Sequence, residues 1–261
     1  MLALLVLLAS GAAFAAAPPQ RVVSLDYCAD QFVLRMLPRD SLLAVSPDAD
    51  KAFSYMRDAA AGLPTVRPVA EDVLTLEPDL VVRSYGGGPQ AAGFFRRAGI
   101  AVLQVPYADD VDGIRRVIRT IAEGLQVPER GEEIIAEMNR RLQELPVSGE
   151  TRTALYMTPT GATSGPGTQI HEMLLAAGLD NFEQRPGWRM IPLERLAYEQ
   201  PDVVAAAFFD GTGDHLAMWS PMRHPLARRQ MLDRPTVRLQ GAWTSCGGWF
   251  LLDAIEALAA Q

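Results

Sequence analysis

Aromatic side chains follow several predicted β-strands of this sequence, where parallel sheets commonly bind ligands. Six candidate ligand-binding residues lie at or just beyond predicted strand ends: Tyr27, Arg83, Tyr85, Tyr107, Phe209 and Trp243. Planar rings stack on large, partly apolar ligands, and a tyrosine oxygen is able to ligate iron. The set therefore predicts a site for a metal chelate, a macrocycle or an aromatic siderophore. Trp188 and Trp219 form a weaker second candidate rim.

Arg83 and the glycine loop after it have two interpretations each. Arg83 ends the apolar segment 80–83, so it either reaches a ligand oxygen in the cleft or is held by solvent or an internal acid. The loop Ser84-Tyr-Gly-Gly-Gly-Pro89 either presents backbone N–H groups to an anion or is a plain strand-to-helix turn. It lacks the Lys-Ser or Lys-Thr of a nucleotide-binding loop.

The two cysteines, Cys28 and Cys246, follow predicted strands in opposite halves of the chain. Three interpretations stay open at this point: a disulfide between the halves, two separate buried thiols, or soft ligands for a metal or haem. A disulfide needs Cα atoms within about 7 Å, and spacing along the sequence does not give that distance.

The histidines and potential nucleophiles do not form the patterns of a metal-ion site or of a catalytic site. His171, His215 and His224 all lie in the second half, so we predict no site for bare zinc or manganese. His215 is either a surface-loop residue or an axial ligand to haem or a corrinoid. Ser164 lies outside a Gly-x-Ser-x-Gly motif, and Cys28 has no local Cys/His signature. We therefore predict a protein that is not an enzyme.

Charge and the first residues limit the partners and the compartment. The formal net charge of −7 provides no basic surface, so we expect no nucleic acid partner. Residues 1–17 combine a short apolar run with an Ala-x-Ala site, which is typical of a secretory signal peptide. Since no Leu-x-x-Cys lipidation site follows, we expect a free periplasmic protein and a monomer, rather than one held by a retained N-terminal helix.

Short apolar strands alternate with helices in both halves, which predicts an α/β fold with two mostly parallel sheets flanked by helices. We expect a signal peptide at 1–17, an N-terminal lobe at 18–108, a helical linker at 109–146 and a C-terminal lobe at 147–261. Predicted strands cover 21–25, 42–46, 80–83, 101–105, 153–157, 202–207 and 236–240. Predicted helices cover 30–37, 89–98, 110–125, 128–146, 169–177, 225–232 and 249–260.

The linker contains an amphipathic helix that divides the chain. Pro128 suits its first turn, Pro146 ends it, and Glu137 and Arg141 are spaced for an ion pair within the helix. At 1.5 Å per residue its roughly 18 residues span about 27 Å. Such a helix is long enough to join two lobes, and Asp109 or Asp110 is available to cap the helix before it.

One motif occurs in both halves with the same spacing. Glu71 precedes Pro78-Asp-Leu-Val, and Glu194 precedes Pro201-Asp-Val-Val, each by seven residues. In both copies a short helix with an outward glutamate ends at Pro-Asp and leads into an apolar strand. Two such motifs in register indicate an internal duplication, and two facing parallel sheets predict a cleft between the lobes.

These features resemble the periplasmic substrate-binding proteins of ABC importers for ferric siderophores, vitamin B12 and haem. The resemblance rests on Arg21-Val-Val-Ser-Leu, the two Glu-to-Pro motifs and the bridging helix. It implies a class III fold, with two lobes joined by one long helix and a rather rigid hinge. It also implies that Glu71 and Glu194 dock to arginines of an inner-membrane permease; otherwise each is a solvated residue at the start of a helix.

The resemblance implies binding and delivery without chemistry on the ligand, and no intrinsic cofactor. A ferric siderophore is expected first, cobalamin or a related corrinoid second and haem third, so the ligand is an iron or cobalt chelate. An exported enzyme and a binding protein without a transport role are the alternatives outside this class.

Overall fold

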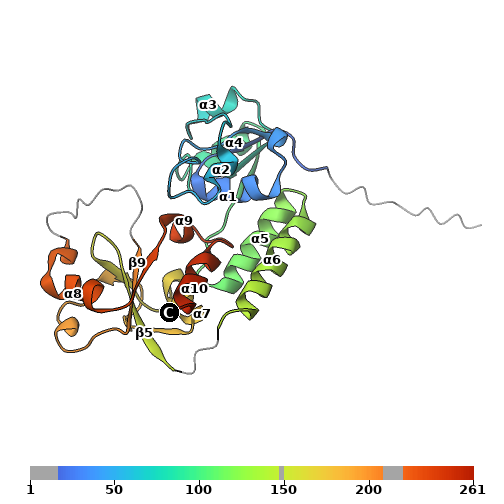
Figure 1. Ribbon diagram of the computed structural model, residues 1–261. Coiled ribbons are helices and arrows are strands. Elements are labelled where there is room, and N and C mark those ends of the chain that lie inside the picture. The colour runs from blue at the N-terminus through green and yellow to red at the C-terminus, as the bar shows by residue number, and fades with distance from the viewer. Residues whose placement is uncertain (1–16, 147–149, 208–219) are drawn as a thin grey trace, which may run out of the picture.

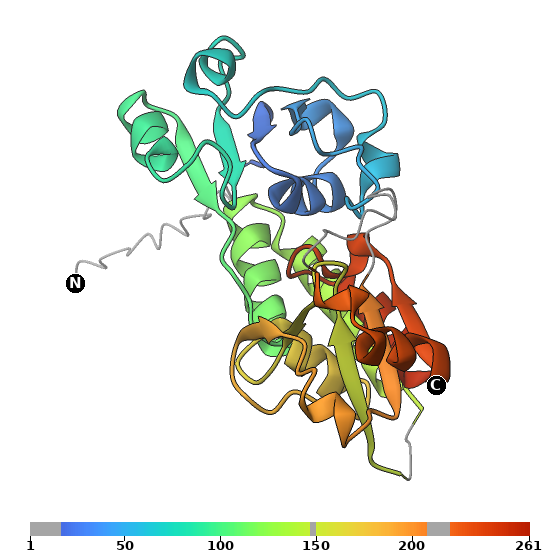
Figure 2. The ribbon, with the colours of Figure 1, turned by 90° about the vertical axis from the view of Figure 1, so that its left-hand side faces the viewer.

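The computed structural model describes residues 17–146, 150–207 and 220–261, which form two α/β lobes beside a pair of helices (Figure 1). Seen from the side, the N-terminal lobe lies above the C-terminal lobe (Figure 2). The alternation of strands and helices along the chain agrees with the predicted fold class.

The N-terminal lobe contains a four-stranded parallel sheet. Its strands are β1 (Val22–Ser24), β2 (Leu42–Ala44), β3 (Leu80–Arg83) and β4 (Ala101–Gln104), in the order β2-β1-β3-β4. The helices are α1 (Tyr27–Met36), α2 (Arg57–Ala60), α3 (Ala70–Leu74) and α4 (Ala91–Arg97), with a short 3-10 turn η1 (Arg39–Ser41). Strand β1 is buried along its length, as expected for a strand covered on both faces.

The C-terminal lobe repeats this design. Its main sheet contains β5 (Arg152–Met157), β7 (Leu179–Asn181), β9 (Val203–Ala207) and β10 (Thr236–Leu239), all parallel and ordered β10-β9-β5-β7. Its helices are α7 (Gln169–Ala176), α8 (Pro225–Asp233), α9 (Gly241–Thr244) and α10 (Leu251–Ala259), and its 3-10 turns are η2 (Arg195–Ala197) and η3 (Pro221–Arg223). The sequence did not predict the separate two-stranded antiparallel sheet of β6 (Ala162–Ser164) and β8 (Trp188–Met190).

The two main sheets have the same strand order. When the strands of each sheet are numbered in the order in which they occur in the chain, both sheets have the spatial order second, first, third, fourth. This order is β2-β1-β3-β4 in the N-terminal lobe and β7-β5-β9-β10 in the C-terminal lobe. The repeated Pro-Asp motif has the same contacts in both: Asp79 accepts the N–H of Arg21 at 3.1 Å, and Asp202 accepts the N–H of Thr153 at 2.8 Å. Each aspartate thus fixes the start of the first strand of its own lobe, which supports the duplication.

Helices α5 (Val111–Gly124) and α6 (Pro128–Gln143) lie side by side between the lobes (Figure 1). Asp110 caps α5 by accepting the N–H of Gly113, as the sequence indicates. Gly131 permits close packing of the pair, because a Cβ there would lie 2.6 Å from the Cβ of Ala122. The bridge is therefore a helix pair, and α6, with 16 residues, is slightly shorter than predicted.

The predicted ion pair within α6 is wrong. Glu137 pairs with Arg35 of the N-terminal lobe at 3.3 Å, and Arg141 pairs with Asp253 at 2.6 Å and Glu256 at 2.7 Å on α10. Both side chains turn away from each other because each meets an oppositely charged group on a different lobe. Helix α6 thereby contacts both lobes through charged residues.

The lobes also share apolar packing. One core cluster includes residues of both lobes and of both bridging helices, from Val22 through Ile118 and Ile134 to Leu258. Across it, the rings of Phe32 and Trp249 meet edge to face at 5.6 Å, and those of Tyr55 and Phe250 stack at 5.0 Å. These contacts stiffen the joint between the lobes. Within the described ranges, no helix is both long and apolar enough to cross a membrane.

Candidate functional site: the cleft between the lobes

A cleft of about 310 Å³ lies between the lobes. Both lobes contribute to its lining, which comprises Tyr27, Cys28, Phe32, Ser84, Tyr85, Val105, Pro106, Tyr107, Ala108, Gln169, Ile170, Trp188, Thr244, Ser245, Cys246 and Gly247. The lining residues of the N-terminal lobe follow β1, β3 and β4, at the carboxyl ends of these strands, where open parallel sheets bind ligands. Three of the six predicted ligand-binding residues, Tyr27, Tyr85 and Tyr107, are in this set.

The N-terminal lobe supplies an aromatic wall. Tyr27, which is the first residue of α1, meets Phe53 at 4.9 Å and Tyr85 at 6.1 Å between ring centroids, both edge to face. Tyr85 is 53% exposed and Tyr107 is 72% exposed. These rings therefore offer open faces and edges to a ligand.

The C-terminal lobe supplies the opposite wall. Trp188 projects from β8 and meets Tyr156 of β5 edge to face at 5.9 Å. Gln169, at the start of α7, is buried at the cleft, and its amide nitrogen has no hydrogen-bond partner. An unpaired buried N–H is unfavourable, so this amide is a candidate donor to an acceptor on a ligand. Trp188 joins the cleft as the weaker sequence signal indicated, and Trp219 lies outside the described residues.

The glycine loop that carries Tyr85 is occupied by an anion of the protein itself. One carboxylate oxygen of Asp26 accepts the N–H groups of Ser84, Tyr85 and Gly86 at 2.7, 3.0 and 2.8 Å. Its other oxygen caps α1 by accepting the N–H of Ala29 at 3.0 Å. The loop therefore does present its N–H groups to an anion, but the anion is Asp26 and not a ligand. The sequence did not single out Asp26 for this role.

Arg83 lies outside the cleft lining and holds the same loop from another direction. Its guanidinium donates to the carbonyl oxygens of Gly86 at 2.7 Å and Gly88 at 3.0 Å, and to the side chain of Gln104 at 3.0 Å. With 6% of its surface exposed, it is not available to a ligand in this arrangement. Neither sequence interpretation of Arg83 describes this arrangement, because its partners are backbone carbonyls and a neutral amide.

The two cysteines form a disulfide at the cleft. Cys28 of α1 and Cys246, just after α9, have Cα atoms 5.6 Å apart. Both residues line the cleft, so the bond connects the lobes across it. Of the three interpretations, the disulfide between the halves is therefore correct.

Besides Arg83, two further predicted ligand-binding residues are absent from the described lining. Trp243 lies on α9, half-buried against the main core cluster. Phe209 lies outside the described residues, as does His215. The lining also includes Phe32 and Gln169. The sequence did not single them out, because both lie inside segments that resemble ordinary amphipathic helices.

The environment of the cleft keeps its tyrosines protonated. Burial, followed by the carboxylates of Asp26 and Asp48, raises the pKa of Tyr27. Burial is also the main cause that raises the pKa of Tyr85, with Tyr27 next, and burial and Asp109 raise the pKa of Tyr107. Ionisation of these phenols in the absence of a ligand therefore costs more free energy than in water. In the described part of the chain, no group of three or more His, Cys, Asp or Glu residues is arranged to hold a metal ion.

The two candidate docking glutamates are exposed at equivalent motif positions. Glu71 lies in the first turn of α3, and Glu194 directly precedes η2. Nearby arginines already have other acidic partners: Arg67 pairs with Asp72, and Arg195 pairs with Glu199. Neither glutamate forms an ion pair with any residue that the structure describes.

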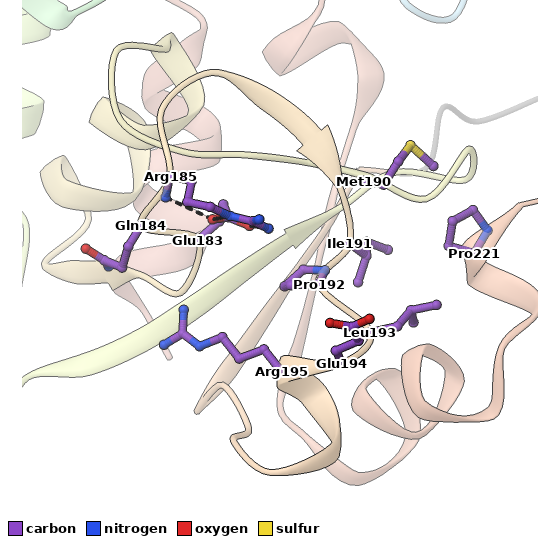
Figure 3. Close-up of a pocket in the computed structure, with 10 residues that line it drawn as sticks. All are labelled: Glu183, Gln184, Arg185, Met190, Ile191, Pro192, Leu193, Glu194, Arg195 and Pro221. Atoms are coloured by element: carbon purple, nitrogen blue, oxygen red, sulfur yellow. Dashed lines mark hydrogen bonds and ion pairs between the residues drawn. The ribbon is translucent and has the colours of Figure 1, made fainter.

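Glu194 also borders a separate hollow of about 600 Å³ on the C-terminal lobe (Figure 3). Arg185 is directed toward Glu183 on one side of this hollow, and Met190 and Pro221 lie on the other. Ile191, Pro192 and Leu193 add apolar surface to the lining. Among the residues that the structure describes, none lines both this hollow and the interlobe cleft.

Comparison with known proteins assigns the family. Residues 32–211, more than half of the chain, match the family described as periplasmic binding protein. The chain therefore belongs to the periplasmic binding protein family, and its fold is that of the class III members, with two lobes. Members of this family are binding proteins, so the chain is a binding protein and not an enzyme.

Similar proteins span nearly the same length. The vitamin B12-binding protein of Photorhabdus laumondii is 23% identical over 275 residues, which cover 100% of this chain and 94% of that protein. A periplasmic haem-binding protein of Vibrio cholerae has a TM-score of 0.76 at 18% identity, covering 92% of this chain and 98% of that one. The periplasmic vitamin B12-binding protein of Vibrio cholerae has a TM-score of 0.68 at 22% identity, covering 93% and 96%. At these identities the solved structures define the fold.

Proposed function

We propose that this protein captures an uncharged metal chelate between its lobes, with cobalamin or a related corrinoid as the first candidate. The supporting observation is the chemistry of the cleft lining: aromatic rings, hydroxyls and one amide, with no Lys, Arg, His, Asp or Glu among the described lining residues. A corrinoid offers a flat, partly apolar ring with peripheral amides. Those groups match the aromatic walls and the unpaired amide nitrogen of Gln169.

The same lining makes charged chelates less suitable. A ferric catecholate carries several negative charges and haem carries two propionates, and buried anions need paired cations or hydrogen-bond donors. Although the sequence favoured ferric siderophores in general, this lining favours uncharged ferric hydroxamates within that class. They are the second candidate, followed by haem. The Photorhabdus laumondii relative is a vitamin B12-binding protein, which is in accord with the first choice.

We further propose that the mature chain begins near Pro18, is free of a lipid anchor and acts as a periplasmic monomer. Delivery then requires docking to an inner-membrane ABC permease. Glu71 and Glu194 are suited to this task, because each is an exposed carboxylate that forms no ion pair within the described chain. Charge-assisted hydrogen bonds to two separated arginines would fix the orientation of the protein on the permease.

A ligand panel tests the proposal. The purified mature protein is titrated with cyanocobalamin, a ferric hydroxamate, a ferric catecholate and haemin, and tryptophan fluorescence and thermal melting are recorded. We expect saturable binding of cyanocobalamin, with the rise in melting temperature that linkage requires. Exclusive binding of the catecholate or haemin would contradict the argument from the uncharged lining. An inner-filter control with free tryptophan is needed because these ligands absorb strongly.

A further inference from the structure

We infer that Asp26 is a positioning residue for ligand binding, because it fixes the loop 84–88 so that Tyr85 meets Tyr27 in one arrangement. Asp26 is 3% exposed and does not line the cleft, so it does not act by touching a ligand. The expected effect of Asp26 on ligand affinity rests on the proposed function. Its effect on the loop itself is independent of any ligand.

The contacts of Asp26 explain why a carboxylate is required. One oxygen accepts three consecutive N–H groups of the loop, and the other oxygen caps α1. Such charge-assisted bonds are stronger than bonds between neutral groups. Asparagine has one carbonyl oxygen, so it is unable to serve the helix and the loop at once.

Two further features leave the loop a single conformation. Arg83 holds the carbonyl oxygens of Gly86 and Gly88, while Asp26 binds the N–H groups. A Cβ on Gly86 would lie 2.4 Å from the carbonyl oxygen of Leu25, so the backbone there packs directly against the end of β1. Three N–H groups and two carbonyl oxygens of the loop are thus bound by two buried side chains from neighbouring strand ends.

Tyr27 and Tyr85 are coupled through this arrangement. Tyr27 directly follows Asp26 in the chain, and Tyr85 carries one of the three N–H groups that Asp26 binds. Their rings therefore keep the edge-to-face geometry, at 6.1 Å, before a ligand arrives. A preformed aromatic wall strengthens binding because its side chains are already ordered in the free protein, so binding costs less conformational entropy.

The test combines binding with a double-mutant cycle, with cyanocobalamin as the probe. We expect Asp26→Asn to weaken binding about ten-fold in the wild-type background and less than two-fold in Tyr85→Ala, because the two residues act as a unit. Asp110→Asn is the matched control: it alters the helix cap of α5 at Gly113, away from the loop, and should leave affinity unchanged. An equal fold loss in both backgrounds would overturn the inference.

Amide hydrogen exchange without ligand supplies the second readout. The amides of Tyr85 and Gly86 should exchange slowly in the wild type and at least ten-fold faster in Asp26→Asn. Asp26→Ser, which retains a good helix cap, gives the same comparison if the asparagine variant folds poorly. Fast exchange of both amides in the wild type would overturn the inference. If cyanocobalamin does not bind the wild type, the ligand assignment fails, while this exchange result still decides the role of Asp26.

Discussion

Cys28 and Cys246 form a disulfide across the cleft, although they lie 218 positions apart in the sequence. The bond connects the start of α1 in one lobe to the segment after α9 in the other. Together with the contacts of α6 to both lobes, it limits how far the lobes can separate. The cleft thus has a covalent link on its wall and a helix pair beside it.

Loss of this disulfide should destabilise the protein and loosen the joint. For a closed loop of this length, the entropy model gives up to about 5 kcal/mol of stabilisation. Cys28→Ser/Cys246→Ser should therefore unfold at lower urea concentration and show a larger radius in small-angle X-ray scattering. A reductant should shift the wild type in the same direction and leave the double variant unchanged. Equal urea midpoints for the two proteins would argue against a structural role for the bond.

Asp30 should make stability depend on pH. Its burial raises the pKa to about 6, even though hydrogen bonds from the hydroxyl and the backbone N–H of Ser46 act in the opposite direction. Since the folded pKa exceeds the unfolded one, the folded state binds more protons between about pH 4 and pH 6. The free energy of unfolding therefore decreases as pH rises through this window.

Substitution of Asp30 by asparagine should remove that penalty. Asp30→Asn keeps the shape and an acceptor for Ser46, and should raise the free energy of unfolding by roughly 2 kcal/mol at about pH 7.5. The advantage should shrink toward about pH 4.5, as followed by urea denaturation at each pH. Asp180→Asn, at an exposed position of β7, is the control. A pH-independent difference between Asp30→Asn and the wild type would rule out this titration as the cause.

Trp188 and Trp243 should respond differently to truncation. Trp188 lines the cleft, so Trp188→Ala should weaken chelate binding by about 2 kcal/mol, or roughly 30-fold. Trp243 packs against the core beside the cleft, so Trp243→Ala should lower the melting temperature with little change in affinity. Titration and thermal melting of both variants check this contrast. A larger loss of affinity for Trp243→Ala would return that residue to the site.

Arg141 should contribute much more to stability than its neighbour Arg140. Arg141 is 19% exposed and bonds to both Asp253 and Glu256, whereas Arg140 pairs with Glu144 on an exposed helix face. We expect Arg141→Met to cost about 2 kcal/mol and Arg140→Met less than about 0.5 kcal/mol by urea denaturation.

The Arg141 network also has a pH dependence of known sign. The hydrogen bond from Arg141 is the main cause that lowers the pKa of Glu256. The stabilisation is therefore complete above the unfolded pKa of Glu256, about 4.3, and is lost as pH falls below it. In Arg141→Met this acid-dependent part should disappear; an unchanged acid limb would contradict the assignment.

If Glu71 and Glu194 dock to the permease, their loss should affect uptake of the chelate but not its binding. Glu71→Ala/Glu194→Ala should retain chelate affinity, because neither residue lines the cleft, and should abolish transport in cells that depend on this protein. Glu129→Ala, another exposed glutamate in the first turn of a helix, is the matched control. Normal uptake by the double variant would remove both glutamates from the docking surface.

The sequence by itself determined the order of elements and the two-lobe design. Apolar periodicity is local, so it located strands such as 80–83 and helices such as α7 within a few residues. The duplicated Glu-to-Pro motif also predicted the shared design of the two lobes, because the Pro-Asp turn that starts β3 and β9 is encoded within a few residues. The aromatic residues after the strands indicated the cleft for the same reason.

The tertiary structure alone decided which distant groups meet. It brought Cys28 and Cys246 within reach of a disulfide, and it placed Asp26 and Arg83 where both bind the loop 84–88. It also paired Glu137 with Arg35 rather than with Arg141. Each outcome depends on distances between segments far apart in the chain, which spacing along the sequence does not specify. A buried charge takes the partner that the fold brings within hydrogen-bond reach, so Arg83 binds backbone carbonyls where the sequence suggested a ligand.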